Sequence, residues 1–316
     1  MKAKSTYSPV EVGAFPTTIE FSHVLSEKSG RSIYIKHEDQ ADQIGSGNKV
    51  RKINYLFEYL HKQGINHIIA DGTTQSNSLM SLVHYAKIQG FSTHCIVYGD
   101  TSMIGNYSLI ARDATTVTHL DKWDAAKIEK ARADITGRLE QDGSSVYSAP
   151  TGLSSPETLR AGMDIADEIF NYERQSDISF DDIIVAAGTG STVAGLSYKD
   201  QKNTGTNRVV GAVIANNADF FKNECRKYFT KLGENELALP EFDQNALGRG
   251  YGLHTQADER LQRSLLESGE FYDSVYMLKT VKCALNRALQ STRDSAILVI
   301  HTGGNNQRAA VEEVHR

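Results

Sequence analysis

The amino-acid sequence predicts an α/β fold in which helices cover mostly parallel sheets. Short apolar runs bounded by turn residues recur along the chain and indicate buried parallel strands. They span 67–70, 94–99, 115–120, 145–150, 182–187, 209–215 and 297–302. Helical patterns alternate with these runs, and that alternation is typical of this fold class.

The first helix is predicted over residues 49–63, which carry an apolar stripe along one face. The stripe consists of Val50, Ile53, Leu56, Phe57 and Leu60. A second helix is predicted over 77–89, after the first apolar run. Polar stretches at 199–207 and 232–248 indicate loops.

The chain has 316 residues and shows no recognisable linker between domains. We therefore expect two closely packed domains, a larger one formed by 1–50 and 160–316 and a smaller one formed by 51–159. Ligand sites occur preferentially at such domain interfaces. The active site is therefore expected in the cleft between the two domains.

Composition argues against several classes of protein. The net charge is −5, and Lys and Arg alternate with acidic residues, so a nucleic-acid partner is not expected. No stretch reaches the about 18 consecutive apolar residues of a membrane span. The first residues also lack the apolar core of a signal peptide, so we expect a cytoplasmic protein without a membrane partner.

The three cysteines, Cys95, Cys225 and Cys283, stand apart from one another and from suitably spaced histidines. Their spacing indicates neither a disulfide framework nor a metal site. We expect buried, unreactive thiols.

A lysine begins the first predicted helix, in the run GSGNK at 45–49. Unpaired backbone N–H groups and the positive end of the helix dipole disfavour a further cation there, which favours a neutral, nucleophilic amine. Lys49 is therefore a candidate catalytic residue. The alternative is an ordinary solvated lysine in a basic run with Arg51 and Lys52.

Two loops that follow predicted strands offer sites for anions. The first contains Gln75, Ser76 and Asn77 ahead of a helix, and its unpaired N–H groups suit a carboxylate, although Ser76 could simply cap the helix. The second reads GTGST at 188–192 and supplies amides and hydroxyls for a phosphate. It lacks the lysine of nucleotide-hydrolysing P-loops, and a plain strand-to-helix turn is the alternative.

Further candidates stand near glycines in the second half of the chain. They are Tyr251, Tyr276 and Thr302, each of which would more often be a packing residue when taken singly. A lysine amine, a phosphate loop, a carboxylate loop and tyrosines in one α/β chain favour pyridoxal 5′-phosphate. The aldehyde of this cofactor requires an amine, and its phosphate requires a loop of donors.

These segments, in this order, resemble the fold-type II pyridoxal-phosphate enzymes of the D-cysteine desulfhydrase and 1-aminocyclopropane-1-carboxylate (ACC) deaminase family. The resemblance covers nearly the whole chain, from the opening strand signals FPTTIE at 15–20 and YIKHEDQ at 34–40 to HTGG at 301–304. It implies a two-domain fold similar to that of the tryptophan synthase β subunit, with pyridoxal 5′-phosphate as the cofactor.

The resemblance implies a set of cofactor-binding residues. Lys49 is similar to the family's cofactor-binding lysine, Asn77 to the partner of the 3-hydroxyl group, and Asn48 stands where it can orient the lysine. Thr302 is a candidate partner of the pyridine nitrogen. The phosphate loop corresponds to Gly188, Thr189, Gly190, Ser191 and Thr192.

The resemblance also implies which residues act on the substrate. Ser76 is similar to a serine that lies over the substrate, and Gln75 and Asn77 flank it in the same loop. Tyr251 and Tyr276 are similar to two active-site tyrosines implicated in proton transfer or substrate activation.

Two positions depart from the family pattern. The deaminases carry a glutamate immediately after the tyrosine at position 276 and the desulfhydrases usually carry a hydroxyl residue, whereas this chain has Met277. After HTGG the family continues with small and apolar residues, whereas this chain reads NNQR at 305–308. We expect this change to make one wall of the pocket more polar.

The resemblance predicts a lyase that acts on a small amino acid, most simply by β-elimination from a D-cysteine-like substrate to give a 2-oxo acid and ammonia. A homodimer is expected. Alternatives within the cofactor class are ACC deamination and a specialised elimination or replacement reaction of secondary metabolism. From other classes, a catalytically inert binding protein and a kinase-like enzyme remain open, although no metal carboxylates support the kinase.

Overall fold

A computed structural model describes residues 11–102, 105–290 and 296–308. They form two compact units, which we call the smaller unit (11–13 and 49–153) and the larger unit (14–48 and the described part of 154–308). The chain passes from the larger to the smaller unit between Asn48 and Lys49 and returns between Leu153 and Ser154. Each unit contains its own sheet.

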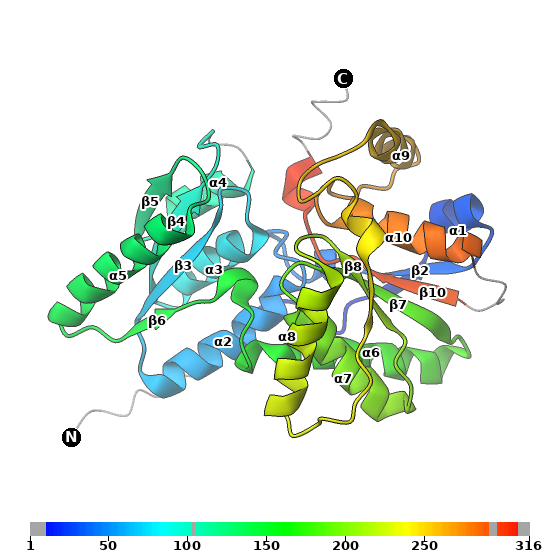
Figure 1. The fold of residues 1–316 in the computed structure, drawn as a ribbon, viewed down its shortest axis with the longest axis horizontal. Helices are drawn as coiled ribbons and strands as arrows, with labels where there is room; N and C mark the ends of the chain where they lie inside the picture. The colour runs from blue at the N-terminus through cyan, green and yellow to red at the C-terminus, as the bar shows by residue number, and fades with distance from the viewer. Residues whose placement is uncertain (1–10, 103–104, 291–295, 309–316) are drawn as a thin grey trace. The chain divides into compact units, whose positions relative to one another are not determined.

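The described residues of the smaller unit form a parallel sheet of four strands in the order β5-β4-β3-β6 (Figure 1). The strands are β3 (His67–Thr73), β4 (Ser92–Tyr98), β5 (Thr116–Leu120) and β6 (Val146–Ser148). The helices are α2 (Lys49–Gln63), α3 (Asn77–Ile88), α4 (Asn106–Asp113) and α5 (Ala125–Gln141). One face of this sheet packs on α5, where Ile69 and Ile96 meet Ile128 and Ile135.

The larger unit contains six described strands in the order β1-β2-β10-β7-β8-β9. Neighbouring strands are parallel except β1 and β2, which are antiparallel. The strands are β1 (Ile19–Phe21), β2 (Ile33–Lys36), β7 (Phe180–Ala187), β8 (Val209–Val213), β9 (Glu241–Asp243) and β10 (Ala296–Ile300). The helices are α1 (His23–Ser29), α6 (Arg160–Ser176), α7 (Ser191–Thr204), α8 (Ala218–Lys231), α9 (Gln256–Glu267) and α10 (Met277–Gln290).

Both faces of the larger sheet are covered by helices (Figure 1). Alternate residues of β7 point to opposite faces, so Ile183 and Val185 join a core with α6, α7 and α8, whereas Ile184 joins a core with α1, α9 and α10. All residues of β8 and β10 are buried. Burial on both faces explains why these strands are continuous apolar runs in the sequence.

The predicted α/β fold with two mostly parallel sheets is confirmed, and each of the seven apolar runs contains a strand. The helix predicted at 49–63 is α2, and β1 and β2 overlap or adjoin the two opening strand signals. The loop predictions are wrong in part, because α7 continues to Thr204 and β9 lies within 232–248. Polar residues at the end of α7 and a three-residue edge strand leave little apolar pattern to detect.

Cys95, Cys225 and Cys283 are free and buried, as predicted. Burial raises the pKa of the Cys95 and Cys225 thiols to about 12, so both groups are protonated at neutral pH. Among the described residues, no helix combines the length and the apolar character that a membrane crossing requires.

Candidate active site

Lys49 is the first residue of α2, where the sequence predicts it. The apolar stripe of the helix is buried in the smaller unit, with Val50, Ile53 and Leu60 fully inaccessible to solvent. This burial fixes the rotation of α2 about its axis and therefore the direction in which its first residue projects.

Lys52, which the alternative interpretation of Lys49 places in a solvated basic run, is 1 % exposed. Its ammonium group donates a hydrogen bond of 3.1 Å to the carbonyl of Gly152. Burial lowers the pKa of Lys52 well below its usual value, and the positive charge of Lys49 lowers it further. Its spacing of four residues from Leu56 places it on the apolar face, and this spacing is the signal that could have identified it.

The QSN loop of the smaller unit is anchored by a residue that sequence reasoning missed. Ser76 caps α3, accepting a hydrogen bond of 3.2 Å from the backbone N–H of Leu79. Asn106, fully buried at the start of α4, donates from its amide nitrogen to the carbonyl of Gln75 at 2.9 Å and to Oδ1 of Asn77 at 2.6 Å. Because Oδ1 of Asn77 accepts this bond, Nδ2 of Asn77 keeps its donors for another group.

The phosphate loop of the larger unit connects β7 to α7. Gly190 has a φ of 93°, a conformation that favours glycine, and it immediately precedes the first turn of α7. The first N–H groups of a helix have no acceptor within the helix and point outward, toward the position of an anion.

Hydroxyl groups surround this helix start. Ser154 Oγ lies 2.6 Å from Thr189 Oγ1 and 2.9 Å from Ser191 Oγ, within hydrogen-bond distance of both. Asn48 donates from Nδ2 to Thr192 Oγ1 at 3.3 Å. The loop is therefore a cluster of hydroxyls and backbone amides, to which Ser154 contributes although nothing in its sequence context identified it.

The two candidate tyrosines lie together in the larger unit. The rings of Tyr251 and Tyr276 meet edge to face, with centroids 6.1 Å apart. Tyr276 also packs against the phosphate loop, since a Cβ atom on Gly188 would stand 3.0 Å from its Cε1 atom. Tyr251 is 47 % exposed, so a ligand that enters from solvent can contact it.

Met277 and Thr302 are in contact. The thioether sulfur of Met277 accepts weak hydrogen bonds from the backbone N–H of Thr302 at 3.3 Å and from its hydroxyl group at 3.5 Å. Met277 is fully buried at the start of α10, where the carboxylate of Asp273 accepts from its N–H at 3.0 Å. A buried, apolar side chain therefore lies directly after Tyr276 and against Thr302.

The HTGG segment packs directly on the segment that leads to Lys49. Asn48 donates from its backbone N–H to the carbonyl of Thr302 at 3.2 Å. The side chain of Asn305 donates to Asp39 at 3.0 Å, and that of Asn306 donates to the carbonyl of Ile44 at 2.6 Å. Both asparagines of the NNQR run, which departs from the family pattern, thus form hydrogen bonds within the larger unit.

These features fit pyridoxal phosphate. The phosphate loop combines a helix start, a hydroxyl cluster and a glycine at which a Cβ atom would press on Tyr276. Ser46, in the run before Lys49, has a buried hydroxyl group without a hydrogen-bond partner among the described residues. Such an unsatisfied buried group is typical of a segment that lines a ligand site.

Comparison with known proteins identifies the class. The family model described as pyridoxal-phosphate dependent enzyme matches residues 10–303, so the chain belongs to this family, with the fold of its fold-type II members. More narrowly, it is a member of the ACC deaminase and D-cysteine desulfhydrase family.

Three similar proteins support this placement. The bifunctional D-cysteine desulfhydrase/1-aminocyclopropane-1-carboxylate deaminase of Arabidopsis thaliana is 27 % identical over 92 % of this chain and 76 % of its own length. The D-cysteine desulfhydrase of Serratia proteamaculans is 26 % identical over 91 % of both chains. The crystal structure of an ACC deaminase homologue superposes with a TM-score of 0.84 at 26 % identity, covering 98 % of this chain and 97 % of that one.

Proposed function

We propose that this pyridoxal-phosphate enzyme catalyses β-elimination from a small, D-cysteine-like amino acid, releasing a 2-oxo acid and ammonia. The observation that carries this proposal is the buried contact between Met277 and Thr302. We place Thr302 at the pyridine nitrogen, and the thioether beside it supplies no carboxylate to hold a proton on that atom. A weaker electron sink suits elimination of a good leaving group better than opening of a cyclopropane ring.

The proposed cofactor residues are those that the family resemblance implies. Lys49 forms the covalent link, Asn48 orients it, and Asn77 donates to the 3-hydroxyl group, while Thr302 faces the pyridine nitrogen. The phosphate is held by Gly188, Thr189, Gly190, Ser191 and Thr192. When bound, pyridoxal phosphate withdraws electrons from the bonds to the substrate's Cα atom.

The proposed catalytic residues are Lys49, Ser76, Tyr251 and Tyr276. The substrate carboxylate is bound by Gln75, Ser76 and Asn77 at the start of α3, where backbone N–H groups and the helix dipole favour an anion. With the cofactor bound, the amine of Lys49 or the hydroxyl group of Tyr251 or Tyr276 would accept the proton from the substrate's Cα atom. We further propose that the enzyme is a cytoplasmic homodimer.

A substrate panel tests the proposal. Wild-type holoenzyme and Met277→Glu are assayed with D-cysteine, L-cysteine, β-chloroalanine and ACC, following 2-oxo acid and ammonia. We expect wild type to turn over at least one β-substituted amino acid about tenfold faster than ACC, and Met277→Glu to shift this ratio toward ACC. Met277→Leu is the matched control, because it removes the sulfur acceptor without adding a carboxylate.

The outcomes separate the candidate functions. Faster turnover of ACC than of every β-substituted substrate by wild type would favour ACC deamination, the second candidate, to which the bifunctional Arabidopsis relative points. No 2-oxo acid from any substrate, by protein that retains its cofactor, would favour an inert binding protein.

Replacing Gly190 by valine is expected to weaken cofactor retention about tenfold, because the branched side chain disfavours the φ of 93° that starts α7. Gly205→Val is the control, since Gly205 ends the same helix with a φ of 76° and has open space around it. Retention is measured from cofactor absorbance after dialysis. If the two variants lose equal amounts of cofactor, backbone strain in α7 causes the loss, and the phosphate loop does not.

Asn106→Asp tests the orientation of Asn77. The variant places an oxygen against Oδ1 of Asn77 and the carbonyl of Gln75, so we expect the Asn77 amide to turn and cofactor affinity to fall about tenfold. The control Asn223→Asp makes the same change in charge on the exposed face of α8. An unchanged dissociation constant in Asn106→Asp, measured by fluorescence titration of apoenzyme, would remove Asn77 from the cofactor site.

A further inference from the structure

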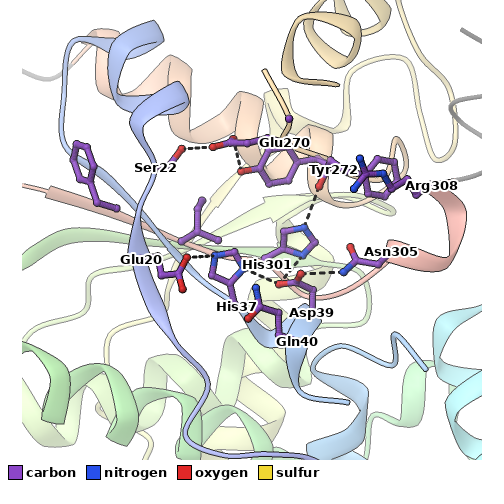
Figure 2. A pocket seen from close by; sticks show the side chains of 14 residues that line it. Glu20, Ser22, His37, Asp39, Gln40, Glu270, Tyr272, His301, Asn305 and Arg308 are labelled. Carbon is purple, nitrogen blue, oxygen red and sulfur yellow. Dashed lines mark hydrogen bonds and ion pairs between the residues drawn. The ribbon is translucent and has the colours of Figure 1, made fainter. Parts of the chain in front are cut away.

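The larger unit contains a polar cavity of about 450 Å³. Its walls come from β1 and the residue after it, from β2 and the segment that follows it, from residues 269–272 and from the segment that follows β10 (Figure 2). Ser22, Glu270 and Tyr272 lie along one side of the view, and His37, Asp39 and Asn305 along the other, with His301 between them. None of its lining residues is among those proposed to bind the cofactor or the substrate.

Glu270 is an acidic group of this cavity that forms no ion pair within the described part of the chain. Its Oε1 atom accepts from the hydroxyl group of Ser22 at 2.8 Å, and its Oε2 atom accepts from the hydroxyl group of Tyr272 at 2.9 Å. Both donors are neutral. Among the described residues no Lys, Arg or His side chain forms an ion pair with Glu270, although the carboxylate is half-buried. Its charge is therefore held in place but not neutralised.

The electrostatic field inside the cavity is negative. Burial lowers the pKa of His37, but the hydrogen bond to Asp39 and the charges of Asp39, Glu20 and Glu270 outweigh burial and raise it. Burial and the charge of Glu270 raise the pKa of Tyr272 well above its usual value. The charge of Glu270 contributes to raising the pKa of both groups, and the same charge favours a cation over an anion beside it.

Aromatic rings complete the cavity. Tyr272, Phe271 and Phe21 line it together with Ile35, and the ring of Tyr272 lies 5.3 Å from that of His301. Aromatic faces attract organic cations and exclude the water that a bare metal ion retains. At the rim, the guanidinium of Arg308 lies 5.9 Å from the centroid of Phe271, which places a positive charge at that edge of the cavity.

We propose that this cavity is a binding site for a small organic ammonium ion, whose charged group lies against Glu270 between the aromatic rings. A simple amine and an amino acid share this group, and an amino acid would add a carboxylate near Arg308. His301 and Asn305, which flank residues 302–304, both line the cavity.

Isothermal titration of holoenzyme tests the proposal with tertiary amines, which cannot form a Schiff base with the cofactor. The probes are dimethylaminoethanol, which lacks a carboxylate, and N,N-dimethylglycine, which has one. Glu270→Gln keeps the size of the side chain and removes its charge, and we expect it to raise the dissociation constant about tenfold or more. Glu267→Gln, on the exposed end of α9, is the matched control, and the uncharged isostere 3-methyl-1-butanol is the control probe.

Binding of both amines, with loss only in Glu270→Gln, supports the site and shows that the ammonium suffices. Binding of dimethylglycine alone, with the same dependence on Glu270, supports the site and identifies an amino acid as its ligand. Binding of neither probe, equal binding of the alcohol, or affinity unchanged in Glu270→Gln overturns the proposal. Should Glu270→Gln fail to fold, Glu270→Asp provides a second comparison, because it shortens the side chain and withdraws the carboxylate from Ser22 and Tyr272.

Discussion

Lys49→Ala is expected to abolish turnover, with kcat reduced about a thousandfold or more, because the variant loses both the covalent link to pyridoxal phosphate and the proposed amine base. The measurement is 2-oxo acid release under saturating substrate and added cofactor. Lys62→Ala is the matched control, since Lys62 lies on the same helix with its side chain 68 % exposed. We expect the control to retain wild-type activity.

The structure offers a second candidate for the covalent link, Lys52, so an experiment has to distinguish the two lysines. A buried lysine with a lowered pKa is a typical nucleophilic amine, and Lys52 lies one turn after Lys49 in the same run. Borohydride reduction of the holoenzyme followed by peptide mapping distinguishes them. A label on Lys49 that persists in Lys52→Met supports the proposal, whereas a label on Lys52 in wild type would transfer the role to that residue.

Sequence patterns predicted the fold well wherever burial on both faces makes a strand continuously apolar. The runs that became β8 and β10 are examples, since every residue of each strand is buried. β9 was missed because it has three residues at a sheet edge and buries only Phe242. One apolar residue carries no periodicity, so its strand depends on pairing with β8, which no local pattern reveals.

The position of a candidate residue in the fold was predictable where it follows from its neighbours in sequence. Lys49 and Gly190 precede or begin helices, and these positions are visible as a glycine followed by a helical pattern. Asn106 and Ser154 were not predictable, because they act through residues that lie 29 and 35 positions away, Asn77 and Thr189. Such contacts are set by the packing of whole elements, and a single sequence contains no record of that packing.

Gly47→Ala is expected to destabilise the larger unit strongly. A Cβ atom on Gly47 would stand 1.9 Å from the carbonyl oxygen of Thr302 and 2.6 Å from the Cα atom of Gly303. Both are backbone atoms, so no change of rotamer relieves the clash. The segments must separate, breaking the hydrogen bond from Asn48 to Thr302. Since Gly47 also has a φ of +62°, strain and overpacking together predict a loss of about 3 kcal/mol in the free energy of unfolding.

Gly30→Ala separates the two contributions to this loss. Gly30 lies in the same unit with a φ of +70°, but a Cβ atom there meets nothing within 4 Å, so the control carries the strain without the clash and should cost about 1 kcal/mol. Denaturant unfolding of both apoproteins measures the difference. Equal destabilisation would mean that the HTGG segment does not pack on Gly47 in solution. A larger loss in Gly47→Ala, accompanied by weaker cofactor retention, would show that the close approach of two glycine backbones positions the residue before Lys49.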